Sequence, residues 1–136
     1  MATKKVTGKT IKQSVSFKAL PSQVYNALID SKLHAKFSKA KAKISKKVGG
    51  KFTAYDGYLT GKNLILVPGK KIVQSWHSSE WAKGHMSKVT FIFKKIKTGT
   101  KLMFTHNNVP LNDVKDVTEG WKKFYWQPMK KMLEKK

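Results

Sequence analysis

The chain has no cysteine, and although 29 of its 136 residues are basic, it has no arginine. Without cysteine there is no disulfide framework, thiol nucleophile or cysteine-ligated zinc or iron–sulfur site. The lack of arginine argues against sequence-specific nucleic-acid binding, because arginine reads guanine edges with paired hydrogen bonds and lysine acts as a point charge. Acidic residues are also scarce: seven are present, which leaves a net charge of +22.

Long hydrophobic runs are missing as well. No stretch approaches the roughly 20 apolar residues that a membrane-spanning helix needs. The basic segment 1–12 lacks the apolar run of a signal peptide. We therefore expect no membrane span and a cytoplasmic protein. The composition is otherwise that of a globular protein, with 40% hydrophobic and 11% aromatic residues. The length fits a single domain over residues 1–136.

Hydrophobic periodicity predicts mostly strands in the first 107 residues. Alternation predicts a strand over 9–19, after which Pro21 begins a short helix that ends near 29. A second short helix is expected over 32–38, with Ser31 as its cap. Asp56-Gly57 is a strong signal for a two-residue hairpin turn. The six further strands are expected over 39–44, 51–55, 58–66, 70–78, 86–96 and 100–107.

After Pro110 the period changes to that of one long amphipathic helix. Its apolar stripe comprises Val114, Val117, Trp121, Phe124, Tyr125, Met129, Met132 and Leu133. Pro128 lies inside this pattern and predicts a kink. The order of elements indicates an α+β fold in which the long helix crosses the concave face of an antiparallel sheet.

Several motifs, in their order and spacing, resemble one family. They are Tyr55-Asp56-Gly57-Tyr58-Leu59-Thr60-Gly61, the run from Val67-Pro68-Gly69 to Ser75-Trp76, Trp81, Gly99-Thr100-Lys101-Leu102, and the run from Glu119-Gly120-Trp121 to Gln127-Pro128-Met129. Over about residues 13–134 the chain resembles the C-terminal domain of the activator of the heat-shock protein 90 (Hsp90) ATPase, within the START-like (SRPBCC) superfamily.

This resemblance implies a helix-grip fold, with a curved sheet of six or seven strands wrapped around the C-terminal helix. It also implies a non-enzymatic module whose partner is an Hsp90-type chaperone. Relatives with this fold often hold apolar ligands between sheet and helix, so a carrier or sensor of a small hydrophobic ligand is the alternative.

Aromatic residues gather at the end of one strand and on the long helix. They lead us to expect either a filled core or an open cavity between sheet and helix. The candidate lining residues are Trp76, Trp81, Phe91, Phe93, Phe104, Trp121, Tyr125 and Met129.

The positive charge is concentrated in the first 51 residues, which carry 13 lysines and one acid. Two interpretations stay open: a docking face for an acidic partner, or compositional drift toward lysine on an ordinary surface. Non-specific nucleic-acid binding through lysine is a further alternative. The candidate basic docking face comprises Lys36, Lys39, Lys41, Lys43, Lys46 and Lys47.

Catalytic and metal-binding patterns are weak. His77, Glu80 and His85 fall around one loop without the spacing of a metal site. His106, with Glu80 and His85, is the one ionisable set that could enter a cavity. We therefore expect no catalytic residue, no cofactor and no metal.

Overall fold

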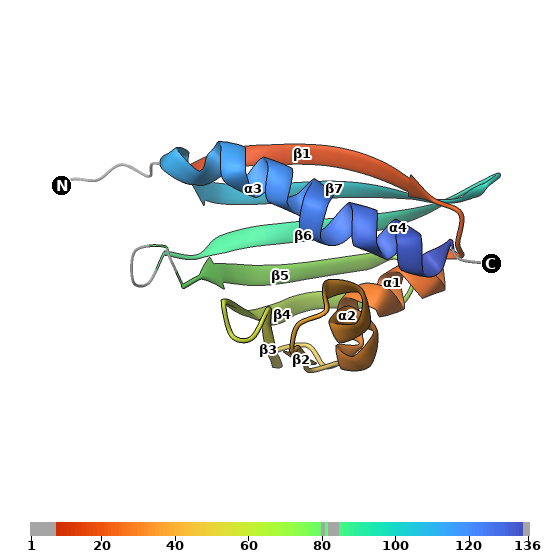
Figure 1. Ribbon diagram of the computed structural model, residues 1–136, viewed down its shortest axis with the longest axis horizontal. Helices are drawn as coiled ribbons and strands as arrows, with labels where there is room; N and C mark the ends of the chain where they lie inside the picture. The colour runs from red at the N-terminus through yellow and green to blue at the C-terminus, as the bar shows by residue number, and fades with distance from the viewer. Residues whose placement is uncertain (1–7, 80, 82–84, 135–136) are drawn as a thin grey trace.

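A seven-stranded antiparallel sheet forms the body of the protein (Figure 1). The structure is a computed structural model that describes residues 8–79, 81 and 85–134. The strand order is β1-β7-β6-β5-β4-β3-β2, so neighbours in sequence pair except where β1 closes onto β7. The strands are β1 Gly8–Phe17, β2 Lys43–Ile44, β3 Lys51–Ala54, β4 Leu59–Val67, β5 Lys71–Ser78, β6 Ser87–Ile96 and β7 Gly99–Pro110.

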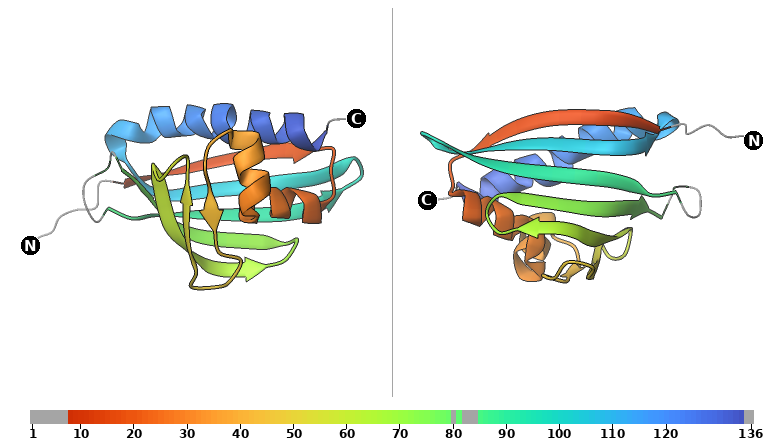
Figure 2. Two further views of the ribbon diagram at one scale, coloured as in Figure 1. Left: turned by 60° about the horizontal axis from the view of Figure 1, so that its bottom comes forward. Right: turned by 180° about the vertical axis from the view of Figure 1, so that it is seen from behind.

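One long helical segment crosses the concave face of this sheet, as the helix-grip fold requires (Figures 1 and 2). It is built from η1 Leu111–Asp113, α3 Val114–Gly120, the π-helical turn η2 Trp121–Trp126 and α4 Gln127–Leu133. Two short helices, α1 Pro21–Ile29 and α2 Ser31–Ser38, pack beside its C-terminal half. None of the helices in the described ranges is long and apolar enough to cross a membrane.

The alternation of side chains along the strands explains the core. In β6 the buried residues Val89, Phe91 and Phe93 face the helix, and the residues between them face solvent. Leu102 and Phe104 of β7 are also buried and face the helix. They lie opposite Phe93 and Phe91 of β6, respectively. This single buried face is the reason that one helix is enough to cover the sheet.

The strand expected over 39–44 is wrong in extent: β2 spans Lys43–Ile44 alone. Lys39 ends α2 in the left-handed conformation, with φ of 58°, and cannot continue into a strand. The predicted two-residue hairpin is also wrong in length. The loop comprises the four residues between Ala54 and Leu59, and Asp56 within it accepts a hydrogen bond of 2.9 Å from the Lys41 backbone N–H.

The cap of α2 is Asp30 and not Ser31 as predicted. The Asp30 carboxylate accepts a hydrogen bond of 3.0 Å from the Leu33 N–H, which satisfies one of the free donors at the helix start. Ser31 is the first helical residue, and its hydroxyl accepts the backbone N–H of Ile44 at 2.8 Å. The serine therefore ties α2 to β2.

Pro128 changes the hydrogen bonding of the long helix. A proline has no N–H to give to the carbonyl four residues earlier, here that of Phe124. The preceding turn is π-helical, and the Tyr55 hydroxyl donates to the Phe124 carbonyl at 2.5 Å. The wider turn buries Trp121, Tyr125 and Trp126, whereas Phe124, predicted for the apolar stripe, is 53% exposed.

Two histidines belong to the buried part of the structure, His34 at 3% exposure and His106 at 0%. Burial disfavours the charged imidazolium, which lowers the pKa of His34 from 6.5 to about 4 and that of His106 to about 3. Both rings are therefore neutral in the folded protein near neutral pH.

We predict that Tyr55→Phe destabilises the protein by about 1 kcal/mol, because the Phe124 carbonyl loses its partner. In a Pro128→Ala background the same change should cost clearly less, since an alanine at that position supplies the missing backbone N–H. Denaturant unfolding of the four proteins measures this coupling. Equal costs in both backgrounds would contradict the explanation.

We also predict that the free energy of unfolding falls as the pH drops from about 7.5 to about 5. Below pH 6.5 the unfolded chain protonates histidines that the folded protein keeps neutral, so acid favours unfolding. The loss is at most about 1.4 kcal/mol per pH unit for each histidine. His34→Gln should remove about half of the difference. Urea unfolding at both pH values is the measurement, and equal stabilities would refute the prediction.

Candidate functional site

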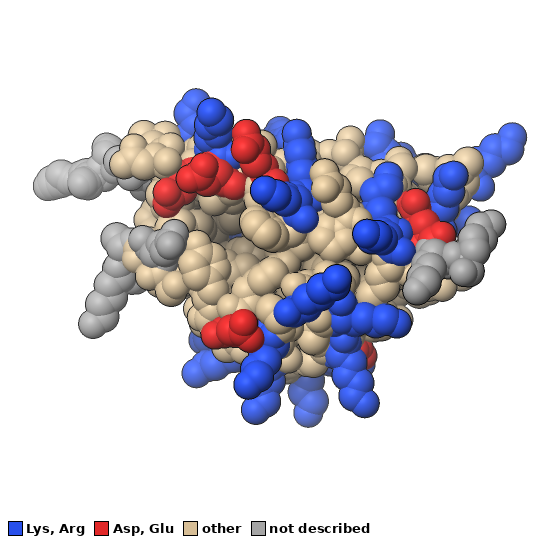
Figure 3. Space-filling view, in the orientation of Figure 1, with Lys and Arg blue, Asp and Glu red and all other residues tan. Residues whose placement is uncertain are grey.

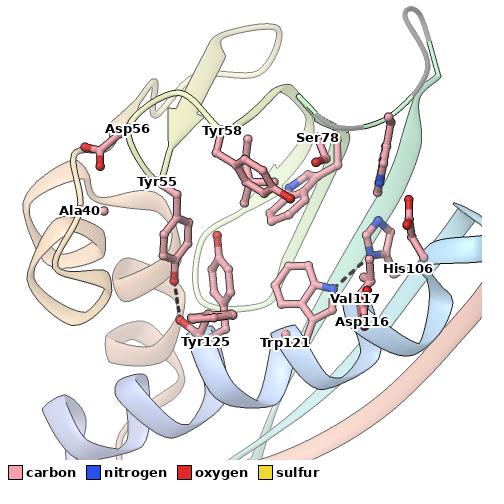
Figure 4. A pocket seen from close by; sticks show the side chains of 16 residues that line it. Ala40, Tyr55, Asp56, Tyr58, Ser78, His106, Asp116, Val117, Trp121 and Tyr125 are labelled. Atoms are coloured by element: carbon pink, nitrogen blue, oxygen red, sulfur yellow. Dashed lines mark hydrogen bonds between the residues drawn. The ribbon is translucent and has the colours of Figure 1, made fainter.

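A cavity of about 580 Å³ opens between the long helix and the ends of β3, β4 and β5. Most of its walls come from three regions: the β3–β4 hairpin, the end of β5 with Trp81, and one face of η1, α3 and η2 (Figure 4). Ala40, after α2, and His106 of β7 complete them. The described lining residues are Ala40, Tyr55, Asp56, Tyr58, Leu59, Trp76, Ser78, Trp81, His106, Asp113, Asp116, Val117, Gly120, Trp121, Phe124 and Tyr125.

Aromatic rings form the inner wall. The ring centroid of Trp121 lies 4.8 Å from that of Trp76 and 4.5 Å from that of Tyr125. The indole N–H of Trp76 donates to the Gln74 side chain at 3.1 Å, and that of Trp121 donates to His106. With these donors already used, neither indole offers a ligand a free N–H group.

His106 is held on both sides of its ring, and Figure 4 shows its bond to Trp121. Its Nδ1 accepts the Trp121 indole N–H at 3.1 Å, because an indole nitrogen can only donate. The proton of the neutral ring is therefore on Nε2, which donates to the Ser87 hydroxyl at 2.7 Å. The Ser87 hydroxyl in turn donates to the Trp76 carbonyl. This arrangement positions the indole and leaves neither ring nitrogen free for proton transfer.

The phenol groups at the inner wall are similarly engaged. The Tyr125 hydroxyl bonds to His34 Nε2 of α2 at 3.0 Å, and the Tyr55 hydroxyl bonds to the helix. Burial raises the pKa of both phenols. These bonds fix the wall and connect it to α2.

The mouth of the cavity carries negative charge. Asp113 and Asp116 line it from the start of the helical segment, and Asp56 lines it from the β3–β4 turn. No described lining residue is a lysine. The sequence analysis missed these carboxylates as site residues. Their signal was the three-residue spacing of Asp113 and Asp116, which places both on one side of a helix.

The predicted lining residues divide into two groups. Trp76, Trp81, Trp121 and Tyr125 line the cavity. Phe91, Phe93, Phe104 and Met129 are not among its described walls and lie in the buried core, where Phe104 packs under Trp121 with centroids 4.3 Å apart. The interior is thus filled toward β6 and β7 and open toward β3–β5.

The six lysines of the predicted basic docking face are all exposed. They lie on α2, at its end, on β2 and in the turn that follows. A second, shallow hollow lies between α2 and β2–β3 and is lined in part by Lys32, Lys41 and Lys43. Lysines gather along this edge in Figure 3, and others follow the long helix.

The predicted His77, Glu80 and His85 group does not form a described metal site. Glu80 lies outside the described residues. His77 Nδ1 bonds to the His85 carbonyl, and His85 Nε2 bonds to the Asn108 carbonyl, both at 2.8 Å. Within the described ranges, no three histidine or acidic side chains are grouped as metal ligands would be.

Comparisons with known proteins identify relatives of this chain. The activator of 90 kDa heat shock protein ATPase homolog of Dictyostelium discoideum is 36% identical over 123 residues, which cover 89% of this chain and 32% of that protein. The human activator homolog 1 is 29% identical, over 89% of this chain and 35% of its own length. The chain thus spans about a third of the length of these curated relatives.

The match to one solved structure extends over nearly the full length of both chains. It is described as an HSP90 activator from Plasmodium falciparum, with a TM-score of 0.88 and 26% identity, over 93% of this chain and 97% of that one. The family model for "Activator of Hsp90 ATPase homolog 1-like protein" matches residues 18–134. With most of its length matched by that model, the chain belongs to the Activator of Hsp90 ATPase homolog 1-like family.

Proposed function

We propose that this chain is a non-enzymatic binding module that docks onto an Hsp90-type chaperone through its basic docking face. The observation that carries the proposal is the likeness to the Plasmodium falciparum HSP90 activator over nearly the full length of both chains. That chain has about the same extent as this one, so a module of this size is itself described as an activator.

The chemistry of the cavity supports a binding role over a catalytic one. His106, the histidine that lines it, is neutral and has both ring nitrogens engaged. The Tyr55 and Tyr125 hydroxyls are engaged as well, and burial raises the pKa of each. General acid–base catalysis needs a group that can exchange a proton near the working pH, and none of these three offers one.

The charge of the docking face supports an acidic partner surface. Among its six lysines, Lys46 is ion-paired, with Asp30 at 3.0 Å, and no other ion pair is found in the described part of the chain. The remaining lysines of the face keep their charge available to a partner. Such a face speeds association with an acidic surface, and this attraction weakens as the salt concentration rises.

We predict that replacing Lys36, Lys39, Lys41 and Lys43 by Gln weakens binding to the chaperone at least about tenfold at physiological salt. Isothermal titration calorimetry and the chaperone's ATPase rate measure the effect. The matched control replaces four exposed lysines of the β6–β7 hairpin, Lys94, Lys95, Lys97 and Lys101, by Gln.

The control variant loses the same net charge, so equal weakening in both variants would assign the effect to overall charge and contradict the docking face. No binding and no change in ATPase rate with the unmodified protein would contradict the chaperone proposal itself.

A second function is favoured by the open cavity: binding of a small hydrophobic ligand. Its volume of about 580 Å³ lies within the range of small-molecule sites, about 300–1,000 Å³. The walls are mainly apolar and rich in aromatic rings, with a few polar groups at the mouth, which is the usual composition of such sites.

We predict that Gly120→Leu blocks this cavity. Gly120 lines it from the helix with φ of −61°, a conformation that every residue adopts, and an added Cβ would meet its nearest atom at 3.7 Å. The leucine side chain therefore enters the open space without backbone strain. Fluorescence of the neutral dye Nile red should report binding to the unmodified protein and to the control Gly120→Ala, and loss in Gly120→Leu. Equal binding to all three would place the dye elsewhere.

A further inference from the structure

The cavity mouth is negatively charged, whereas the protein as a whole carries a large positive charge. Lysine makes up 29 of the 136 residues, a frequency at which sixteen residues would include about three. The sixteen described lining residues include none, but they include three of the chain's seven acids. Figure 3 shows the hollow with acidic atoms on two opposite sides, over α3 and near the β3–β4 turn, whereas lysines gather on other parts of the same face.

Two of these carboxylates have no neutralising partner among the described residues. By contrast, Asp30 pairs with Lys46 and Glu134 accepts the Lys18 backbone N–H. Within the described part of the chain, the side chains of Asp113 and Asp116 accept no hydrogen bond and form no ion pair. The Asp113 side chain does not cap its helix.

The carboxylates and the aromatic wall meet at one end of the cavity. Asp116, Trp121 and His106 all line the cavity (Figure 4), and Trp121 in turn packs against Trp76. The Trp121 and Trp76 indole N–H groups are already bonded, so neither ring offers a ligand a free donor. An aromatic face attracts a cation placed over it, and a nearby carboxylate adds to that attraction.

Distant lysines do not cancel this local preference. At physiological ionic strength charges are screened over about 8 Å, so groups at the mouth outweigh the net charge of the whole protein. His106, the basic residue among the described walls, is neutral and does not repel a cation.

We infer that the cavity selects an organic cation: a quaternary ammonium or protonated amine with an aromatic or alkyl body. The body fills the space against Trp76, Trp121 and Tyr125, and the cationic group lies toward Asp113 and Asp116. This inference rests on the second proposed function, ligand binding in the cavity, and adds the charge of the ligand. The cavity provides the site, and the carboxylates decide between ligands of similar shape.

Three probes of similar shape and different charge test the selection: benzyltrimethylammonium, its neutral carbon analogue neopentylbenzene, and the anion phenylmethanesulfonate. Binding is followed by calorimetry and by NMR of the indole N–H signals at about 0.15 M salt. We expect the cation to bind at least about fivefold more tightly than the neutral probe, and the anion more weakly than both. Gly120→Leu should abolish binding of the cation, which places it in the cavity.

The double variant Asp113→Asn, Asp116→Asn should weaken cation binding about fivefold to tenfold and leave the neutral probe within about twofold. Asparagine keeps the shape of each side chain, and unfolding measurements check that the fold is retained. The control is Glu119→Gln, which removes one acid from the same helix, and this acid is not among the described cavity walls. It should leave cation binding within about twofold.

Three results would overturn the inference. If the neutral probe binds as tightly as the cation, or if the double variant keeps full cation affinity, charge selection is wrong while ligand binding in the cavity stands. If none of the three probes binds the unmodified protein, the inference and the second proposed function both fail.

Discussion

The packing of Trp121 against the sheet is the interaction on which the rest of the structure depends. Its ring contacts Phe104 and Phe91 on the core side and Trp76 and Tyr125 on the cavity side. One residue therefore joins the long helix to β5, β6 and β7 and also forms the boundary between the filled and the open part of the interior. Its indole N–H is fixed by His106, whose own orientation is fixed by Ser87.

The same cluster explains how a largely closed core coexists with a cavity. Toward β6 and β7 the strands supply Phe91 and Phe104, which fill the space under the helix. Toward β3–β5 the wall is lined by the hairpin residues Tyr55 and Tyr58, and Tyr55 is held against the helix by its bond to the Phe124 carbonyl. The aromatic rings thus lie between the helix and this end of the sheet.

The sequence allowed the fold class to be predicted because periodicity is strong where one face is buried, as in β6, β7 and the long helix. Prediction failed where tertiary bonds override local preference. Lys39 is left-handed, and the segment after it is tied to Asp56, so β2 is short. Phe124 fits the apolar spacing of an α-helix, but the π-helical turn rotates it outward.

The candidate site was predicted in part for a similar reason. Aromatic spacing identified Trp76, Trp121 and Tyr125, because large rings near one strand end and one helix must meet in this fold. It could not separate them from Phe91 and Phe104, since the boundary between core and cavity depends on the height of the helix above the sheet. The carboxylates were overlooked because each has a local explanation, a turn or a helix start, and their shared direction appears only in three dimensions.

The placement of the four tryptophans gives the protein an optical property of its own. Trp76, Trp81 and Trp121 lie in the cavity wall, whereas Trp126 is buried outside its described lining and bonded to Gln13. Three of the four tryptophans therefore lie within contact distance of whatever occupies the cavity. The unmodified chain can consequently report its own occupancy through its intrinsic fluorescence, without a label.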